Sequence, residues 1–175
     1  MGSIVLTGFM GTGKTAVGRE VARRLGWQFV DTDQLVEDAA GMTIAQIFAR
    51  FGEAEFRSRE RDAIARACAT PQVVMATGGG AMVDPDNRAR LKAAGTVVCL
   101  DADVDTILAR VGDDPGRPLL RSAEGGDVRE RVRKLLAKRE AAYAAADHRV
   151  STAGRTVAEV AGAVLAAVSE RGGGR

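Results

Sequence analysis

The sequence predicts an α/β fold in which one parallel sheet of five strands carries helices on both faces, giving three layers. Three observations predict it. Five short apolar stretches alternate with segments whose apolar residues recur at helical spacing. A glycine-rich loop joins the first strand to the first helix. The length of 175 residues, with no internal repeat and no linker, suits a single domain over residues 1–175.

Composition and charge limit the classes of partner. Hydrophobic residues make up 46% and charged residues 27% of the chain, as in a soluble globular protein. The net charge is only +2, with arginines interleaved among acids, which argues against nucleic-acid binding. No apolar run approaches the roughly 20 residues that span a bilayer, and no signal peptide precedes the first strand. We expect a cytoplasmic protein without membrane or nucleic-acid partners, in which Cys68 and Cys99 are buried thiols.

The loop at residues 8–15 reads Gly-Phe-Met-Gly-Thr-Gly-Lys-Thr, the G-x-x-x-x-G-K-[ST] pattern of a phosphate-binding loop. It lies between an apolar strand, Ser3–Thr7, and a helix expected over Lys14–Leu25, which is the context that the pattern requires. Glycines let backbone N–H groups turn toward an anion, and the helix points its positive N-terminal end at the same place. Lys14 is expected to contact nucleotide phosphates and Thr15 to hold Mg²⁺. The alternative, a glycine-rich turn before an ordinary helix, is disfavoured by this context.

Two carboxylates follow the second strand, which is expected at residues 27–30. They belong to the run Asp31-Thr32-Asp33. Open α/β sheets bind ligands at the carboxyl ends of their strands, so these carboxylates are candidate ligand contacts. Helix capping is the alternative, because Asp33, with Glu37 one turn later, could simply begin a helix over Gln34–Ala40.

The remaining elements alternate along the chain. Further helices are expected over residues 43–48, 53–69, 85–94, 104–111, 127–146 and 157–169, and further strands over residues 73–76, 96–100 and 149–151.

Gly52 interrupts the chain before the charged helix of residues 53–69, in which acids and arginines alternate at helical spacing. On spacing alone, Arg57 is interpreted as a solvated side chain that pairs with Glu60 or Glu53, and ligand binding is the less favoured alternative.

Three glycines, Gly78-Gly79-Gly80, follow the third strand. Glycines there let the backbone approach a ligand closely, and a flexible turn is an equally weighted alternative. The acid that commonly binds magnesium at the end of this strand is absent. A metal ion would therefore depend on Thr15, water and Asp31.

Residues 112–126 combine glycine, proline and mixed charge around Arg117, which is typical of a long exposed loop. A lid over a transferring phosphate must exclude water, and an arginine in it could stabilise the transition state. The helix of residues 127–146 is rich in basic side chains, for which a solvated face is the alternative to ligand binding. The single histidine, His148, is interpreted as a surface residue.

The class of nucleotide-binding protein is narrowed by what the sequence lacks. A GTPase needs an N-K-x-D motif to read its base, but the only asparagine, Asn87, is followed by arginine. A motor or large ATPase usually has an acid at the end of the third strand and a longer chain. A small kinase that phosphorylates a metabolite or a nucleotide remains.

The chain resembles the shikimate kinase family over nearly its whole length. Only the phosphate loop is specific by itself, and the set of motifs at this spacing carries the resemblance. The matching pieces, in chain order, are Gly8–Thr15, Asp31-Thr32-Asp33, Ile47-Phe48, Gly52-Glu53, Phe56-Arg57 with Glu60, Gly78-Gly79-Gly80, Arg117-Pro118-Leu119-Leu120, and Lys138-Arg139 with Tyr143.

This resemblance implies a P-loop kinase fold with a substrate-binding helical segment at about residues 32–60 and a lid at about residues 112–126. It implies phosphorylation of the 3-hydroxyl of shikimate by ATP, within aromatic amino-acid biosynthesis. Arg57 and Arg139 would bind the shikimate carboxylate, for which the planar guanidinium is suited. The ring hydroxyls would be bound by Asp33, which is also a candidate base, and by Gly79 and Gly80.

On the nucleotide side, the resemblance implies that Lys14 and Arg117 neutralise the transferring phosphoryl group. Mg²⁺ would be held by Thr15 and, through water, by Asp31. Arg110 and Arg155 match positions near the adenine, although the stretch around Arg155 matches the family poorly. The complete set of expected ATP contacts is Gly11, Thr12, Gly13, Lys14, Thr15, Ala16, Arg110, Arg117 and Arg155.

Two other functions stay open at this point. A related sugar-acid kinase, similar to gluconate kinase, would share the phosphate loop but fits the other motifs less well. A non-catalytic nucleotide-binding module is disfavoured by the presence of Lys14, Asp33 and Arg117 together. Family precedent implies a monomer.

Overall fold

The computed structural model of the chain describes residues 2–111 and 127–170, which form a five-stranded sheet and the helices around it. The strand order is β2-β3-β1-β4-β5, and every neighbouring pair is parallel. This confirms the predicted fold class. The strands are β1 (Ser3–Thr7), β2 (Gln28–Asp31), β3 (Val73–Ala76), β4 (Gly95–Asp101) and β5 (His148–Ser151).

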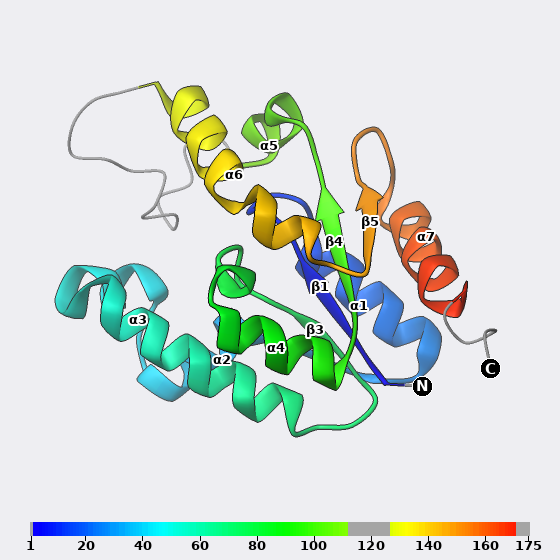
Figure 1. Ribbon diagram of the computed structural model, residues 1–175, viewed down its shortest axis with the longest axis horizontal. Coiled ribbons are helices and arrows are strands. Elements are labelled where there is room, and N and C mark those ends of the chain that lie inside the picture. Colours follow the sequence, from blue (N-terminus) through cyan, green and yellow to red (C-terminus); the bar gives the residue numbers. More distant parts are fainter. Residues whose placement is uncertain (1, 112–126, 171–175) are drawn as a thin grey trace.

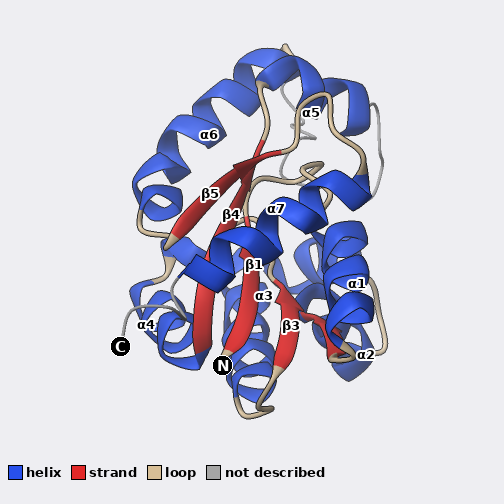
Figure 2. Cartoon of the chain, turned by 90° about the vertical axis from the view of Figure 1, so that its right-hand side faces the viewer, coloured by secondary structure: helices blue, strands red, loops and turns tan. Residues whose placement is uncertain are grey.

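Helices cover both faces of the sheet, as Figure 1 and Figure 2 show. In Figure 2, α7 lies in front of the sheet and α3 and α4 lie behind it. The helical segments are α1 (Lys14–Leu25), α2 (Thr32–Ala40), α3 (Ile44–Cys68), the 3₁₀ turn η1 (Ala81–Val83), α4 (Pro85–Ala94), α5 (Val104–Val111), α6 (Val128–Ala144) and α7 (Val157–Glu170).

Strand β1 shows why the sheet has a core on each side. All five of its residues are buried, and successive side chains point to opposite faces. Ile4 and Leu6 join the apolar cluster under α1 and α7, which includes Val21. Val5 joins the cluster on the other face, to which α3 contributes Ile64. A continuous apolar run is therefore what a central parallel strand requires.

The topology creates a ligand site between the carboxyl ends of β1 and β3. These strands are neighbours, but β1 continues into α1 on one face and β3 continues toward α4 on the other. Open α/β sheets bind ligands in the crevice where neighbouring connections diverge in this way. The phosphate loop follows β1 and the three glycines follow β3, so both predicted motifs flank this crevice.

Two local details differ from or refine the sequence analysis. Helix α2 begins at Thr32 rather than Gln34, and its cap is Asp31, whose carboxylate accepts a hydrogen bond from the Asp33 N–H. The capping interpretation was therefore assigned to the wrong aspartate, and the Asp33 side chain is left available. Gly52 adopts φ 81° and ψ 178° inside α3, which confirms the predicted interruption.

Among residues 2–111 and 127–170, no helix has the length and apolar character needed to cross a membrane. The predicted lid, residues 112–126, lies outside the described residues.

Candidate active site

The loop after β1 has the form of an anion cradle. Gly13 is the N-cap of α1 at φ 87°, a left-handed conformation that favours glycine, and no side chain caps the helix. The first backbone N–H groups of α1 are therefore open to a ligand. The Lys14 ammonium folds back over the loop and donates hydrogen bonds to the carbonyl oxygens of Gly8 (2.9 Å) and Phe9 (2.8 Å). Thr12 is buried, and its hydroxyl donates to Phe9 O at 2.8 Å, so it supports the loop from inside.

A pocket of about 430 Å³ opens over this loop. The structure brings most of the predicted nucleotide contacts together there. Those that line it are Gly11, Gly13, Lys14, Thr15, Ala16 and Arg110, along with Asp31, Asp33 and Gly79 from the predicted metal and substrate sets.

Thr15 and Asp31 are adjacent at the edge of this pocket, where the Thr15 hydroxyl donates a 2.8 Å hydrogen bond to Asp31 Oδ2. Within the described ranges no group of three or more histidine, cysteine, aspartate or glutamate residues could hold a metal ion by itself. Magnesium in nucleotide sites commonly takes one or two protein oxygens and completes its shell with phosphate oxygens and water. A hydroxyl beside a carboxylate fits that requirement.

Asp33 lies in the first turn of α2 and lines the same pocket. Its Oδ1 is shielded from solvent and has no hydrogen-bond partner among the described residues. Burial, reinforced by the negative charges of Asp31 and Glu60 and opposed by Lys14, raises the pKa of the Asp33 carboxyl to about 6. An unpartnered carboxylate with a pKa close to neutrality is suited to accept a proton from a ligand hydroxyl.

Arg57 is fixed by two carboxylates on its own helix. Its Nη1 donates to Glu60 Oε2 at 2.7 Å, and its Nη2 donates to Glu53 Oε1 at 3.1 Å. Both pairings suggested by the spacing are thus present. The side chain is only 24% exposed, however, and the guanidinium carbon lies 5.1 Å from the centre of the Phe56 ring. Arg57 is therefore a positioned, half-buried cation rather than a solvated one.

Arg139 approaches the same region from α6. The residue is 4% exposed, and its guanidinium carbon lies 5.6 Å from the centre of the Phe9 ring in the phosphate loop. Its Nη1 has no hydrogen-bond partner among the described residues. Arg57, Gly80 and Arg139 line a second pocket of about 340 Å³. The solvated-face interpretation is wrong for Arg139, because tertiary packing buries it.

The three glycines make room for site side chains. A Cβ on Gly78 would lie 2.8 Å from both Asp33 Oδ1 and Glu60 Oε1. A Cβ on Gly79 would lie 3.0 Å from Arg139 Nη1, and one on Gly80 would lie 2.9 Å from both Nη atoms of Arg57. At these separations the charged ends of Asp33, Glu60, Arg139 or Arg57 would have to shift to admit a side chain. The glycines thus let charged groups pack against the backbone, which neither sequence interpretation anticipated.

Two residues of the site were missed as functional candidates. Glu60 is 1% exposed and pairs with Arg57; its pKa is raised by burial, an effect that Arg57 and Arg139 oppose. Tyr143 donates a 2.6 Å hydrogen bond from its hydroxyl to Gly79 O, which ties the glycine segment to α6. Both appear among the family motifs, but their roles depend on contacts between distant segments.

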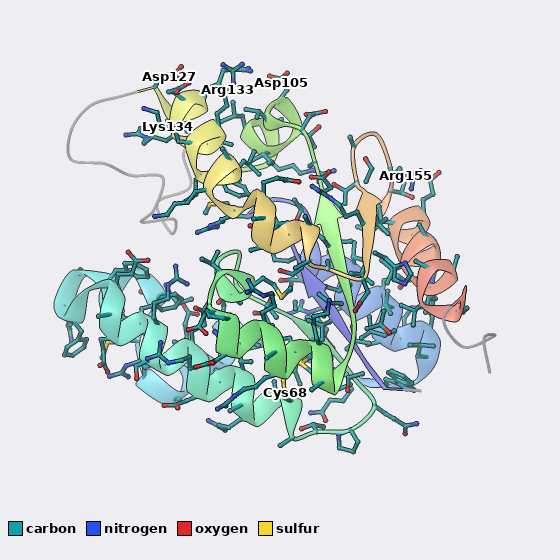
Figure 3. The ribbon with its side chains drawn as sticks, viewed as in Figure 1. Cys68, Asp105, Asp127, Arg133, Lys134 and Arg155 are labelled. Atoms are coloured by element: carbon teal, nitrogen blue, oxygen red, sulfur yellow. The ribbon has the colours of Figure 1, made fainter. Side chains whose placement is uncertain are left out.

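The structure treats the three arginines expected to contact ATP differently. Arg110 donates to the Thr152 hydroxyl (2.9 Å) and to Gly11 O (3.3 Å), which holds the loop after β5 beside the phosphate loop. Arg155 is exposed and lines a different depression, next to β5 and α7 (Figure 3), so the structure does not bring it into the phosphate-loop pocket. Arg117 lies outside the described residues.

The two pockets meet at Gly79 and Gly80, since Gly79 lines the first and Gly80 lines the second. One pocket offers backbone amides and a lysine, which suit phosphates. The other offers Arg57 and Arg139, whose guanidinium groups suit a carboxylate. Asp33 stands on the phosphate side of this junction. The arrangement can hold an acid bearing hydroxyl groups next to the terminal phosphate of a nucleotide.

The comparisons with known proteins agree with this geometry. The profile of the family described as "Shikimate kinase" matches residues 10–169. A shikimate kinase of Geobacter sulfurreducens is 46% identical over 168 residues, which cover 96% of this chain and 91% of that protein.

Solved structures resemble the whole fold. The shikimate kinase from Acinetobacter baumannii in complex with shikimate superposes with a TM-score of 0.92 at 35% identity, covering 98% of this chain and 94% of that one. A gluconokinase from Sinorhizobium meliloti has a TM-score of 0.64 at 19% identity, covering 97% and 93% of the two chains. The latter likeness shows the fold alone.

Proposed function

Because the chain belongs to the shikimate kinase family, we propose that it transfers the terminal phosphoryl group of ATP to the 3-hydroxyl of shikimate. The products are 3-phosphoshikimate and ADP, in the pathway to chorismate and the aromatic amino acids. The observation that carries the assignment is the junction at Gly79 and Gly80 between a phosphate-binding pocket and an arginine-lined pocket. A small hydroxy acid bound across that junction presents a hydroxyl to the nucleotide.

Arg57 and Arg139 bind the shikimate carboxylate in this proposal. They lie on different helices, α3 and α6, and both line the second pocket. Two guanidinium groups on one carboxylate fix orientation as well as affinity, because each offers a planar pair of donors. The ring then extends toward Gly79, Gly80 and Asp33, where its hydroxyls reach the unpartnered Asp33 carboxylate oxygen.

Asp33 accepts the proton of the reacting hydroxyl, and the hydroxyl oxygen forms a bond to the terminal phosphorus of ATP as the bond to the bridging oxygen breaks. ADP leaves with that oxygen. Lys14 neutralises charge that develops on the transferring group, since its ammonium already stands over the phosphate loop. Arg117 is proposed for the same task from the loop at residues 112–126, which lies outside the described residues.

Mg²⁺ is the proposed metal, with Thr15 binding it directly and Asp31 through water. The adjacency of the Thr15 hydroxyl and the Asp31 carboxylate supports this pairing. When bound, the ion supplies positive charge to the phosphate oxygens of ATP. The backbone groups of Gly11, Thr12, Gly13 and Ala16 bind the phosphates beside it.

Arg110 and Arg155 are proposed to flank the adenine. The contacts of Arg110 with Thr152 and Gly11 support its part of this proposal. The position of Arg155, outside the phosphate-loop pocket, does not support a contact of Arg155 with the adenine. We further propose one kinase domain over residues 1–175, with a substrate-binding segment at about 32–60, acting as a cytoplasmic monomer. Sedimentation at micromolar concentration tests the monomer.

Coupled ADP release with shikimate, gluconate and nucleoside monophosphates, assayed in parallel, tests the function. With ATP as the phosphoryl donor, we expect turnover only when shikimate is the acceptor. Turnover only with gluconate would favour a sugar-acid kinase. No turnover with any acceptor, together with retained ATP binding, would favour a nucleotide-binding module.

A further inference from the structure

The second pocket carries more cationic groups than the two arginines proposed to bind the substrate. Lys138 and Arg61 also line it, and so do the acids Glu53 and Asp84. Neither of these two additional cations belongs to the set of substrate contacts proposed above. The pocket is therefore a cluster of alternating charges, and the function of each cation depends on whether an acid already neutralises it.

Two of these four cations have carboxylate partners within hydrogen-bond or ion-pair distance. Arg57 pairs with Glu60 and Glu53, and Arg61 Nη1 lies 3.5 Å from Asp84 Oδ2. Lys138 differs, because it makes no hydrogen bond and no ion pair with any residue in the described ranges 2–111 and 127–170. Four cations thus face three carboxylates when Glu60 is included, and one positive charge is in excess.

We propose that Lys138 is a further specificity-determining residue, which attracts the carboxylate of the acid substrate at the mouth of this pocket. The inference rests on the proposed function and names how the acid is selected. One excess positive charge matches one carboxylate, so an acid is drawn in and a neutral analogue is not. The ammonium acts at a distance through charge, while the buried Arg139 receives the carboxylate at the end of its path.

The positions of Lys138 and Arg139 on α6 fit these two roles, attraction of the carboxylate by Lys138 and its binding by Arg139. Lys138 and Arg139 are successive residues, so their side chains leave the helix about 100° apart. Arg139 points inward against Phe9, whereas Lys138 is exposed and still lines the pocket. An exposed ammonium is well hydrated and screened by salt. Its contribution is accordingly modest in size and sensitive to ionic strength.

The variant Lys138→Gln tests the inference by steady-state kinetics at several ionic strengths. We expect the KM for shikimate to rise about twofold to fivefold at low salt, with kcat unchanged. The fall of kcat/KM with added salt should become shallower, and Lys138→Arg should restore the wild-type slope. Inhibition by the methyl ester of shikimate, which is neutral, should be the same in both proteins.

Lys134→Gln is the matched control. Lys134 lies one turn earlier on α6 (Figure 3), is 76% exposed, pairs loosely with Glu130 at 3.9 Å and does not line the pocket. The substitution Lys134→Gln removes the same charge from the same helix, but outside the pocket. We therefore expect no change in the KM for shikimate or in its salt dependence.

Three results would overturn the inference. An unchanged KM and salt slope in Lys138→Gln, with normal wild-type turnover, would reject it alone. Equal loss of affinity for the acid and its neutral ester would show that Lys138 acts through structure rather than charge. If the wild-type protein did not turn over shikimate at all, the proposed function would fail and this inference with it.

Discussion

The Glu60 carboxylate lies between Arg57 and Asp33, two residues of the proposed acid-binding site. Its Oε2 accepts a hydrogen bond from Arg57 Nη1 at 2.7 Å. Its Oε1 and the Oδ1 of Asp33 both lie next to the point that a Cβ on Gly78 would occupy. A Cβ at that point would be 2.8 Å from each of these two oxygens. Glu60 thus holds Arg57, the arginine proposed to bind the substrate, and also adds negative charge next to the proposed base. Its burial makes this arrangement costly to disturb.

Glu60→Gln should weaken both folding and acid binding. The side chain keeps its shape, but the charge-assisted hydrogen bond to Arg57 becomes a neutral one. We expect a loss of about 1–2 kcal/mol in the free energy of unfolding, measured in urea, and a severalfold rise in the KM for shikimate. Glu55→Gln, which frees Arg59 on the exposed side of the same helix, should change neither quantity appreciably. A lower KM in Glu60→Gln would mean that Glu60 competes with the substrate for Arg57.

The sequence could not show that Glu60 is buried. Along α3 it is one of several acids that alternate with arginines, and the same spacing occurs in the exposed pair Glu55–Arg59. Its environment is created by Gly78 and Arg139, which are distant in the chain. The phosphate loop, in contrast, was predictable because strand, glycines and helix are consecutive. Local sequence patterns were therefore enough to predict the nucleotide half of the proposed site. The family resemblance was needed to predict the acid half.

Asp33 should give stability and activity opposite dependences on pH. Its pKa is about 6 in the folded protein against an ordinary value of 3.8, because burial disfavours the charged form. The folded state therefore holds this proton more tightly than the unfolded state. The resulting stabilisation is complete below pH 3.8 and is lost as the pH rises through about 6.

Urea unfolding of the wild type and Asp33→Asn, without Mg²⁺ and nucleotide, measures this effect. Relative to Asp33→Asn, the wild type should lose up to about 3 kcal/mol between pH 4 and pH 7. Over the same range kcat/KM of the wild type should rise as the carboxylate ionises. Parallel stability curves for the two proteins would show that Asp33 titrates normally.

Thr15 should control the magnesium requirement. Its hydroxyl is the group beside Asp31 that we propose as a direct ligand. Thr15→Val removes the hydroxyl while keeping the shape, and the Mg²⁺ concentration for half-maximal activity should rise about tenfold or more. Thr15→Ser keeps the hydroxyl and should behave like the wild type. Equal magnesium dependence in the valine variant would exclude Thr15 as a ligand.

Residue roles inferred from the family resemblance agree least with the structure where the sequence matches the family motifs least. Arg155 lies in the poorly matched stretch after β5, and the structure places it in a separate depression beside α7. Arg110, in the helix before the predicted lid, does reach the phosphate loop. The cap of α2 shows a related limit: the sequence interpretation assigned the cap to Asp33, and the backbone geometry assigns it to Asp31.

Gly80→Ala should damage acid binding with little loss of stability. Gly80 has φ −103° and ψ −3°, which alanine adopts without strain, so any effect must come from its Cβ. That atom would lie 2.9 Å from both Nη atoms of Arg57 and would displace the guanidinium, the far end of a flexible side chain. We expect the KM for shikimate to rise about tenfold or more, because a misplaced binding group costs orientation. The KM for ATP should stay unchanged.

Gly162→Ala is the matched control for a methyl group added to a glycine. Gly162 lies in α7, and a Cβ there would meet Arg24 Nη1 at 3.6 Å, an ordinary van der Waals distance. Alanine there should raise the free energy of unfolding by about 0.5–1 kcal/mol, because it restricts the unfolded chain, and should leave both KM values unchanged. If Gly80→Ala also left the KM for shikimate unchanged, Arg57 would have room to retreat without losing the substrate. Close packing of Arg57 against Gly80 would then have no part in acid recognition.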